Sequence, residues 1–337
     1  MALRDDILNA VYEANRFHKE YDTEARAKSG EGRIDVFGML VGEDIPVMFR
    51  PLRNLLGAFI DDPGQGVMVT TQRQLPVQRF TAAHELGHAA LGHEASLDDK
   101  EVLTRALFDR NAKFDSREIQ ANAFATALLT PQWLIVEHMQ RQGWNRKDLT
   151  NPVTVYQLSL RMGTSYSATC YALLDCKGID QPACDKLMEA NNKKRAMKQA
   201  LAKPYTPDNW YGDVWVVTEK DNGMVLEGSH SDLVVVKVQE HACSGYVWQF
   251  GELAKAGLTI RGDGRASPGG EHIGGIVFRT VIAEADGTGS GHVSLREVRP
   301  WQAKGTPLNS VELEVDLSGP VAAGLLPVQR KALLEVA

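Results

Sequence analysis

The sequence predicts an α+β protein of more than one domain, with a small antiparallel sheet and helices, then a helical connector, then an all-β sandwich. At 337 residues the chain is too long for one ordinary hydrophobic core, since domains average about 150 residues. Its residues are 43% hydrophobic and 24% charged, which is enough apolar material to bury cores and excludes a disordered chain. Helical periodicity dominates up to about residue 203, and short β-rich runs between glycine-rich turns follow.

The N-terminal segment is the first expected helix. Apolar side chains recur there at the spacing of one helical face, with charges between them, at Leu3, Ile7, Val11, Ala14 and Phe17. This pattern excludes a signal peptide and a membrane span, and no later window reaches the roughly 18 uncharged apolar residues that a spanning helix needs. We therefore expect a cytoplasmic protein without membrane contact.

Four short apolar runs then predict the sheet. The runs 34–41 and 45–49 flank a Gly-Glu-Asp turn, and the runs 57–60 and 67–70 flank Asp-Asp-Pro-Gly-Gln-Gly. The expected structure is a small antiparallel sheet of two hairpins.

Two helices are expected after this sheet. Pro76 suits a first helical turn, and apolar residues recur at helical spacing from there to Gly92. A second helix should begin near Asp115 or Ser116 and end before Pro131.

The first of these helices carries His84-Glu85-Leu86-Gly87-His88, an H-E-x-x-H motif. Two histidines four residues apart lie on one helical face and can present two imidazole nitrogens to one metal ion. Glu85 points elsewhere, but it can reach a water in the ion's open position and take its proton. A five-residue motif of this kind also occurs by chance in ordinary helices. A third ligand is therefore needed to distinguish a metal site from such a helix.

Two patterns compete for the third protein ligand that a catalytic zinc normally has. The metzincin pattern requires glycine at position 91 and histidine at position 94, whereas the chain has Leu91 and Glu94. The gluzincin pattern takes a glutamate from a following helix, and Glu118 stands 30 residues after His88. That spacing fits an antiparallel helix pair.

Glu118 also has a structural interpretation, because Asp115-Ser116-Arg117-Glu118 is close to a capping box. Asn122 lies one turn further along the same helical face. A zinc-bound imidazole usually donates its second N–H to an outer oxygen, which an asparagine can supply. Asn122 therefore favours the ligand role for Glu118.

Three stretches together resemble the ImmA/IrrE metallopeptidases over about residues 1–200: RFTAAHELGH (79–88), EIQANAFA (118–125) and LLTP (128–131). The resemblance implies zinc ligation by His84, His88 and Glu118 and a catalytic role for Glu85. It also implies a substrate, since members of this family cleave helix-turn-helix repressors of phage, mobile-element or stress genes. His93 matches a frequent family histidine, which we interpret as a polar cap or a surface residue.

The helical segment 149–203 has two interpretations. Residues 153–174, with Gly163-Thr164-Ser165 at the turn, resemble the helix-turn-helix that often follows the peptidase part in this family, and a plain helical spacer fits equally well. Residues 186–203 carry six lysines and arginines against one glutamate, which more often forms a solvated face than a phosphate contact. With a net charge of -6 and a pI near 5.9, we expect weak or no DNA binding.

The β-rich runs after residue 204 predict an immunoglobulin-like sandwich. Its loops resemble those of the chagasin-like inhibitors of papain-type cysteine peptidases, and the resemblance implies a recognition end built from Ser244, Gly245, Tyr246, Trp248, Gly274, Gly275, Arg299, Pro300 and Trp301. The two tryptophans also fit core and rim packing. The Asn-Pro-Thr-Thr-Gly wedge of that family is replaced by His241-Ala242-Cys243-Ser244-Gly245, which argues against cysteine-peptidase inhibition.

The sequence thus predicts four parts: a zinc metallopeptidase domain (1–148), the connector (149–203), the sandwich (204–318), and a C-terminal tail (319–337) of a loop and a short helix. We interpret the protein as a zinc-dependent endopeptidase that cleaves a transcriptional repressor, with the sandwich for recognition or regulation. A catalytically idle antitoxin-like or partner-binding protein and a peptidase inhibitor are the alternatives.

The same ligands would accept Mn²⁺ or Fe²⁺, and zinc is the commonest choice. The four cysteines, Cys170, Cys176, Cys184 and Cys243, form no C-x-x-C pair. We therefore expect reduced thiols rather than a second zinc site built from Cys170, Cys176 and Cys184.

Overall fold

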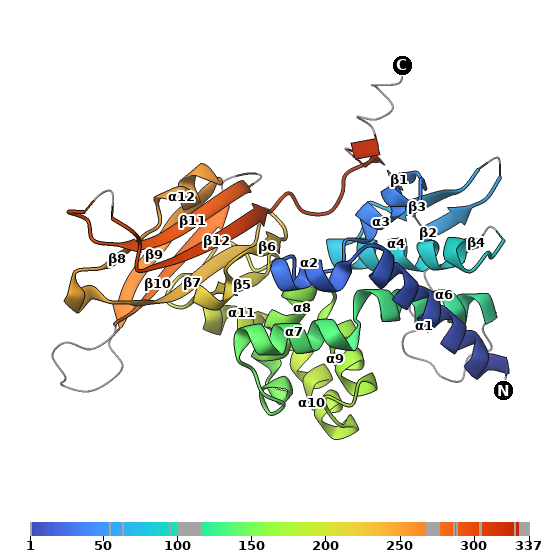
Figure 1. The fold of residues 1–337 in the computed structure, drawn as a ribbon, viewed down its shortest axis with the longest axis horizontal. Helices are drawn as coiled ribbons and strands as arrows, with labels where there is room; N and C mark the ends of the chain where they lie inside the picture. Colours follow the sequence, from blue (N-terminus) through green and yellow to red (C-terminus); the bar gives the residue numbers. More distant parts are fainter. Residues whose placement is uncertain are drawn as a thin grey trace, which may run out of the picture.

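The structure is a computed structural model, and it describes residues 2–53, 55–62, 64–94, 96–99, 116–266, 277–285, 287, 289–302, 305–326 and 328–329. The molecule is elongated, with the N-terminal sheet and its helices at one end and the β-sandwich at the other (Figure 1). Helices α7 to α11 lie between the two ends. The predicted α+β class is confirmed.

The N-terminal part combines helices with one mixed sheet. Its helices are α1 (Ala2–Glu20), α2 (Thr23–Ser29), α3 (Val36–Gly42), α4 (Leu75–Ala90), α6 (Ser116–Leu129) and α7 (Gln132–Gln142). Its strands are β1 (Val47–Arg50), β2 (Leu55–Ile60), β3 (Gly66–Thr70) and β4 (Ser96–Asp99). The two predicted helices around the motif are confirmed as α4 and α6.

The expectation of a strand over 34–41 is wrong, because this run forms α3. Asp35 caps that helix by accepting a hydrogen bond from the Gly38 amide (3.0 Å), and Val36, Met39 and Leu40 bury one helical face. A run of apolar residues this short does not distinguish a helix from a strand, whereas the cap does.

The expectation of two antiparallel hairpins is also only partly correct. Strands β2 and β3 form an antiparallel hairpin, but β1 pairs with β3 in parallel. The strand order is β13-β1-β3-β2-β4, and β13 (Gly324–Leu325) comes from the far end of the chain.

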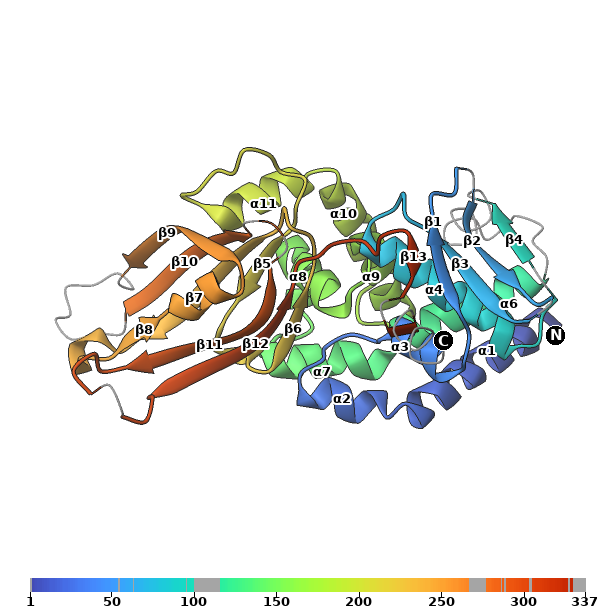
Figure 2. The same ribbon diagram turned by 90° about the horizontal axis from the view of Figure 1, so that it is seen from above.

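The C-terminal segment therefore returns to the N-terminal sheet (Figure 2). β13 pairs antiparallel with β1. The Gln329 side chain accepts a hydrogen bond from the Val47 amide (3.0 Å) and donates one to the Ile45 carbonyl (2.9 Å). Gln78 of α4 exchanges two hydrogen bonds with the backbone of Val321. The predicted loop and helix missed this strand, since pairing across nearly 280 residues leaves no local pattern.

The connector consists of α8 (Pro152–Met162), α9 (Tyr166–Asp175), α10 (Gln181–Asn191) and α11 (Lys194–Ala202). Gly163 takes the left-handed conformation (φ 64°) at the turn between α8 and α9. Tyr166, Thr169 and Cys170 in the first half of α9 are buried, so one face of this helix packs into the core. The choice between a helix-turn-helix and a helical spacer stays a prediction.

The positive charges of residues 186–203 are partly neutralised by a carboxylate. Lys198 is buried, and its amine lies 3.0 Å from the Asp213 carboxylate, while the Lys194 amine lies 3.4 Å from the same oxygen. Two of the six cations thus serve packing rather than phosphate contact.

The sandwich consists of two four-stranded sheets in the orders β5-β7-β10-β9 and β6-β12-β11-β8. Its elements are β5 (Val214–Val217), β6 (Met224–Glu227), β7 (Leu233–Glu240), β8 (Val247–Gln249), α12 (Gly251–Lys255), β9 (Leu258–Ala266), β10 (Val277–Ala285), β11 (Ser290–Val298) and β12 (Asn309–Asp316). A separate apolar cluster fills it, whereas one continuous core joins α1 to α10 of the other half. The domain limits at 148, 203 and 318 stay predictions.

Side chains of α8 cover the edge strand β5 of the sandwich. The Val214 amide donates to the Tyr156 hydroxyl (2.8 Å), and the Gln157 side chain bonds both the Val214 carbonyl (2.8 Å) and the Val216 amide (2.9 Å). Arg161 and Asp221, exposed by only 2% and 0%, form a buried ion pair at 3.0 Å. The connector and the sandwich therefore share a specific, desolvated contact.

No helix among the described residues combines the length and apolarity required to cross a bilayer.

The buried His138 makes the free energy of unfolding depend on pH. Its Nε2 bonds the Gly32 carbonyl (2.6 Å), and burial lowers its pKa from 6.5 to about 4. The folded state then binds fewer protons than the unfolded state between these values, so stability is present above pH 6.5 and is lost as the pH falls towards 4. The free energy of unfolding should fall between pH 7 and pH 4.5 in both proteins, and the fall should be roughly 2–3 kcal/mol smaller in His138→Gln than in the wild type. Urea unfolding at both pH values measures this difference.

The exposed His230→Gln variant is the control and should follow the wild type. Burial raises the pKa of Asp232 to about 6, so this group makes the protein more stable as the pH falls. The test therefore compares the variants with the wild type, which shares this contribution of Asp232. Equal losses in the wild type and His138→Gln would contradict the assignment.

Candidate metal site

Helix α4 carries the motif into the core. It begins after Gln74 with proline in its first turn, and its alanine-rich sequence favours the helix. His84, Glu85 and His88 are exposed by 0%, 0% and 1%. Polar side chains buried this completely require partners, which α6 provides.

The two helices approach closely at Gly87. A Cβ atom at this position would lie 3.1 Å from a ring carbon of Phe124 and 3.2 Å from the Cα of Ala121. Both distances are shorter than most Cβ contacts, so glycine favours this close approach. The close approach brings the N-terminal turn of α6, with Glu118, opposite the two histidines.

Three side chains converge at this point. The two Nε2 atoms of His84 and His88 lie 3.1 Å apart, and the Glu118 carboxylate oxygens lie 3.3 Å from His84 Nε2 and 3.5 Å from His88 Nε2. One ligand atom from each residue falls within 4.8 Å of the other two. Glu118 therefore faces the histidines, which favours the ligand role over the capping box, while Asp115 lies outside the described residues.

This donor set fits a metal ion. Two nitrogens bound tetrahedrally to zinc at about 2.0 Å are separated by about 3.3 Å, close to the 3.1 Å observed. Two imidazoles and one carboxylate are also the ligands of many catalytic zinc sites, which leave a fourth position open. The structure therefore assembles His84, His88 and Glu118 as a candidate metal centre.

Outer residues orient both histidines. The Nδ1 of His84 lies 3.2 Å from Asn122 Oδ1, as predicted for an orienting asparagine. The Nδ1 of His88 lies 3.0 Å from His93 Nδ1, and His93 Nε2 lies 3.0 Å from Gln120 Oε1. If Nε2 of His88 faces a metal, its Nδ1–H donates to His93, whose own Nε2–H donates to Gln120.

Sequence reasoning missed this contact of His93, which had been interpreted as a polar cap or a surface residue. The signal was its position five residues after His88, just beyond the helix end, where the chain turns back at Gly92 (φ 66°). A histidine there can reach the outer nitrogen of the last motif histidine.

Glu85 lies on a different side of α4, beneath strand β2. A Cβ at Gly57 of β2 would collide with the Glu85 carboxylate and with Thr81. Glycine at this position therefore makes room for the carboxylate under the sheet. Such a carboxylate, buried beside a metal centre, can act as a proton acceptor.

The predicted recognition loops are brought together only in part. Arg299 Nε donates to the Ser244 carbonyl (3.2 Å), its guanidinium lies 4.5 Å from the centre of the Tyr246 ring, and Trp301 contacts Gly245. Trp301 is 69% exposed and Pro300 is exposed, whereas Trp248 is buried in the sandwich core at 2%. Gly274 and Gly275 lie outside the described residues.

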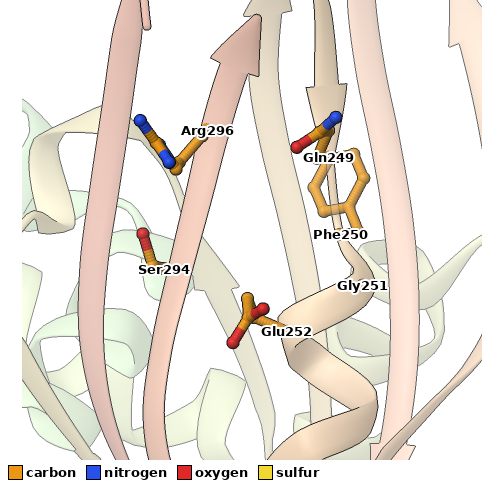
Figure 3. A pocket seen from close by; sticks show the side chains of 6 residues that line it. All are labelled: Gln249, Phe250, Gly251, Glu252, Ser294 and Arg296. Carbon is orange, nitrogen blue, oxygen red and sulfur yellow. The ribbon is translucent and has the colours of Figure 1, made fainter. Parts of the chain in front are cut away.

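These loops stand at the end of the sandwich that points away from α4 and α6, beside β8 and the end of β11 (Figure 1). A hollow of about 540 Å³ near them is lined by Gln249, Phe250, Gly251, Glu252, Ser294 and Arg296 (Figure 3). It contains no group of metal ligands and is separate from the metal centre.

Cys170 and Cys184 are buried free thiols, Cys176 is a partly buried free thiol, and Cys243 is exposed. None of the four belongs to the group of metal-ligating side chains found among the described residues. The expectation of reduced thiols stays a prediction.

A buried His-His-Glu set on two facing helices, with a further carboxylate from the H-E-x-x-H motif, defines a metallopeptidase-type site. Residues 43–174 match the family described as the IrrE N-terminal-like domain. The radiation response metalloprotease IrrE of Deinococcus radiodurans is 30% identical over 149 residues, which cover 42% of this chain and 40% of that protein. The match thus spans less than half of the relative's length.

Solved structures resemble the C-terminal region. A cysteine protease inhibitor of Entamoeba histolytica aligns with 32% of this chain and 99% of its own at 22% identity and a TM-score of 0.30. Amebosin aligns with 31% of this chain and 97% of its own at 19% identity and a TM-score of 0.25.

Substitutions of the outer residues should weaken metal binding without abolishing it. Asn122→Ala and His93→Ala each remove the group that holds one ligating imidazole, so zinc affinity should fall by about 10- to 100-fold. Competition with a chelator measures the dissociation constant. Substituting the exposed His292 with alanine is the control, and unchanged affinity in both outer variants would contradict the orienting role.

Proposed function

We propose that this chain is a zinc-dependent endopeptidase. The observation that carries the proposal is the buried convergence of His84, His88 and Glu118 next to Glu85. The zinc, when bound, would acidify a water and polarise the scissile carbonyl. His84, His88 and Glu118 hold the ion, and Glu85 accepts the water proton and passes it to the leaving amine.

Zinc is proposed because a mixed imidazole and carboxylate set with few ligands is typical of its catalytic sites. Mn²⁺ and Fe²⁺ remain alternatives for the same ligands. The intact ligand set argues against an idle binding protein, and the altered first loop and the buried Trp248 argue against a cysteine-peptidase inhibitor.

The proposed substrate is a helix-turn-helix transcriptional repressor that controls phage, mobile-element or stress genes. The relative from Deinococcus radiodurans is named a radiation response metalloprotease, which supports a role in stress regulation. With Cys170, Cys176 and Cys184 free, the protein would act in a reducing cytoplasm. DNA binding by the connector is proposed to be weak or absent.

An extended peptide could reach the site by strand addition. Residues 67–70 do not suit this role, because β3 lies in the sheet interior between β1 and β2. Among the described strands, β4 is the edge next to β2, which covers Glu85. We propose β4 as the strand that pairs with the substrate.

Glu85→Gln tests the proposed mechanism. Because Glu85 is assigned as a base and not a ligand, cleavage of the proposed helix-turn-helix repressor substrate should fall by at least about 100-fold while zinc content stays near one per chain. Glu118→Ala should instead lose metal. Full cleavage by Glu85→Gln, or loss of its zinc, would refute the assignment, and Glu118→Ala with full zinc would restore the capping interpretation.

The sandwich end that carries Trp301 is proposed to capture the substrate or a regulatory partner. Its arginine and aromatic side chains are the types that dominate protein interfaces. Arg299 is held by Ser244 and Tyr246, so little ordering cost is added on binding. The loops point away from the metal centre, which favours capture over direct blocking of the site.

Trp301→Ala should raise the KM for the repressor by about 5- to 20-fold and leave kcat and zinc content unchanged, since it removes one exposed anchor. Tyr211→Ala, at an 85% exposed linker position, is the matched control. An unchanged KM would remove the sandwich end from recognition, and tight inhibition of papain by the full chain would favour the inhibitor alternative.

A further inference from the structure

An ion cluster joins the metal-site helix to the sandwich. Arg79 of α4 is only 4% exposed, and its guanidinium pairs with the carboxylate of Glu227 at the end of β6. Arg33, from the segment between α2 and α3, pairs with the same carboxylate oxygen. Arg79 also donates to the Gly163 carbonyl at the α8–α9 turn (3.4 Å). The three parts of the molecule therefore meet at the Arg79 guanidinium.

The cluster has no room for rearrangement. A Cβ at Gly163 would overlap the Arg79 guanidinium, so the connector backbone lies directly against it. Burial lowers the pKa of Arg79, and Glu227 opposes that change. A buried guanidinium without its carboxylate would carry an uncompensated charge, which is far more costly than losing an exposed ion pair.

The position of Arg79 gives this contact a consequence for the metal centre. Arg79 precedes His84 by five residues in the same unbroken helix, and α4 also carries Glu85 and His88. A shift of α4 along or about its axis at Arg79 moves both histidines relative to Glu118, which belongs to another helix. The placement of the three ligand atoms relative to one another thus depends on what holds α4.

Gln78, which precedes Arg79 in α4, makes a second contact that holds this helix. Gln78 donates to the Thr70 and Val321 carbonyls at 3.0 and 3.2 Å and accepts from the Val321 amide at 2.8 Å. Val321 belongs to the segment that leaves the sandwich for β13. Neighbouring residues of α4 are therefore fixed by the sandwich and by the chain that returns from it.

We propose that Glu227 is a positioning residue for the metal centre: through Arg79 the sandwich sets the placement of α4 and hence the geometry of His84 and His88 relative to Glu118. The proposal rests on the proposed peptidase function, but the coupling itself concerns the chain alone. Glu227 touches neither metal nor substrate and acts only through Arg79.

Hydrogen–deuterium exchange of the metal-free full chain tests the coupling independently of activity. In Glu227→Gln the amides of residues 75–90 should exchange at least about 10-fold faster than in the wild type. Arg33→Gln removes the other cation of the same carboxylate and leaves the Arg79 pair, so exchange in this helix should stay within about 2-fold. Glu314→Gln, an exposed glutamate on the neighbouring strand β12, is the surface control.

Zinc titration and kinetics supply the functional readout. Glu227→Gln should bind zinc about 10-fold more weakly and lose about 10-fold in kcat with KM changed less than 2-fold, while Arg33→Gln and Glu314→Gln keep wild-type values. If Glu227→Gln does not fold, Glu227→Asp, which keeps the charge but shortens the reach, should show an intermediate exchange rate.

Unchanged exchange in α4 of a folded Glu227→Gln or Glu227→Asp protein would overturn the proposal. Equal acceleration in Arg33→Gln would also overturn it, since that result indicates general destabilisation. A wild-type chain that binds no zinc and cleaves nothing would refute the proposed function, whereas the exchange data on metal-free protein would still decide the coupling.

Discussion

The close contact of α4 with α6 at Gly87 is the constraint on which the metal centre depends. The histidines belong to one helix and Glu118 to the other, so the ligand atoms converge only if the helix backbones approach within contact of Phe124 and Ala121. Glycine inside a helix costs about 1 kcal/mol relative to alanine. The contact offsets that cost by allowing a dense interface, and it concentrates three ionisable groups in an otherwise apolar core.

That concentration explains why the surrounding polar contacts are so specific. Each histidine uses its outer nitrogen on a defined partner, Asn122 for His84 and His93 for His88. These partners fix the ring orientations and tautomers that leave both Nε2 atoms facing one point. Gly57 performs a comparable task from the sheet, because a Cβ at this position would collide with the Glu85 carboxylate beneath β2.

Local patterns predicted the metal site well, and contacts distant in sequence escaped prediction. The motif, α4, α6, Glu118 and Asn122 all follow from helical spacing within about 50 residues, which short-range periodicity encodes. The parallel pairing of β1 with β3 and the return of β13 to β1 depend on chain topology, so alternating apolar residues carried no information about them. The run 34–41 failed for a different reason: its cap, Asp35, outweighs β-propensity in a run too short to show a period. His93 lay just outside the helix, where spacing rules stop applying.

The topology gives the fusion of a peptidase with a sandwich a mechanical meaning. Two domains joined by a flexible linker raise the effective concentration of each other's ligands, and this effect is greatest when the length of the linker matches the distance between the two sites. Here the sandwich is tied to the helical half by the buried Arg161–Asp221 pair, by the Arg79–Glu227 pair and by β13, so the distance from Trp301 to the metal centre is set by packing. A partner bound at the sandwich end can present a cleavable segment at His84 only if it is long enough to span the molecule. A rigid fusion of this kind selects by size and shape as well as by local sequence, and it would exclude short peptides from any benefit of capture.

The same rigidity means that a change in the placement of the sandwich is transmitted to α4 without an intervening hinge, because Glu227 and the helix that carries His84 and His88 are separated by a single side chain, that of Arg79.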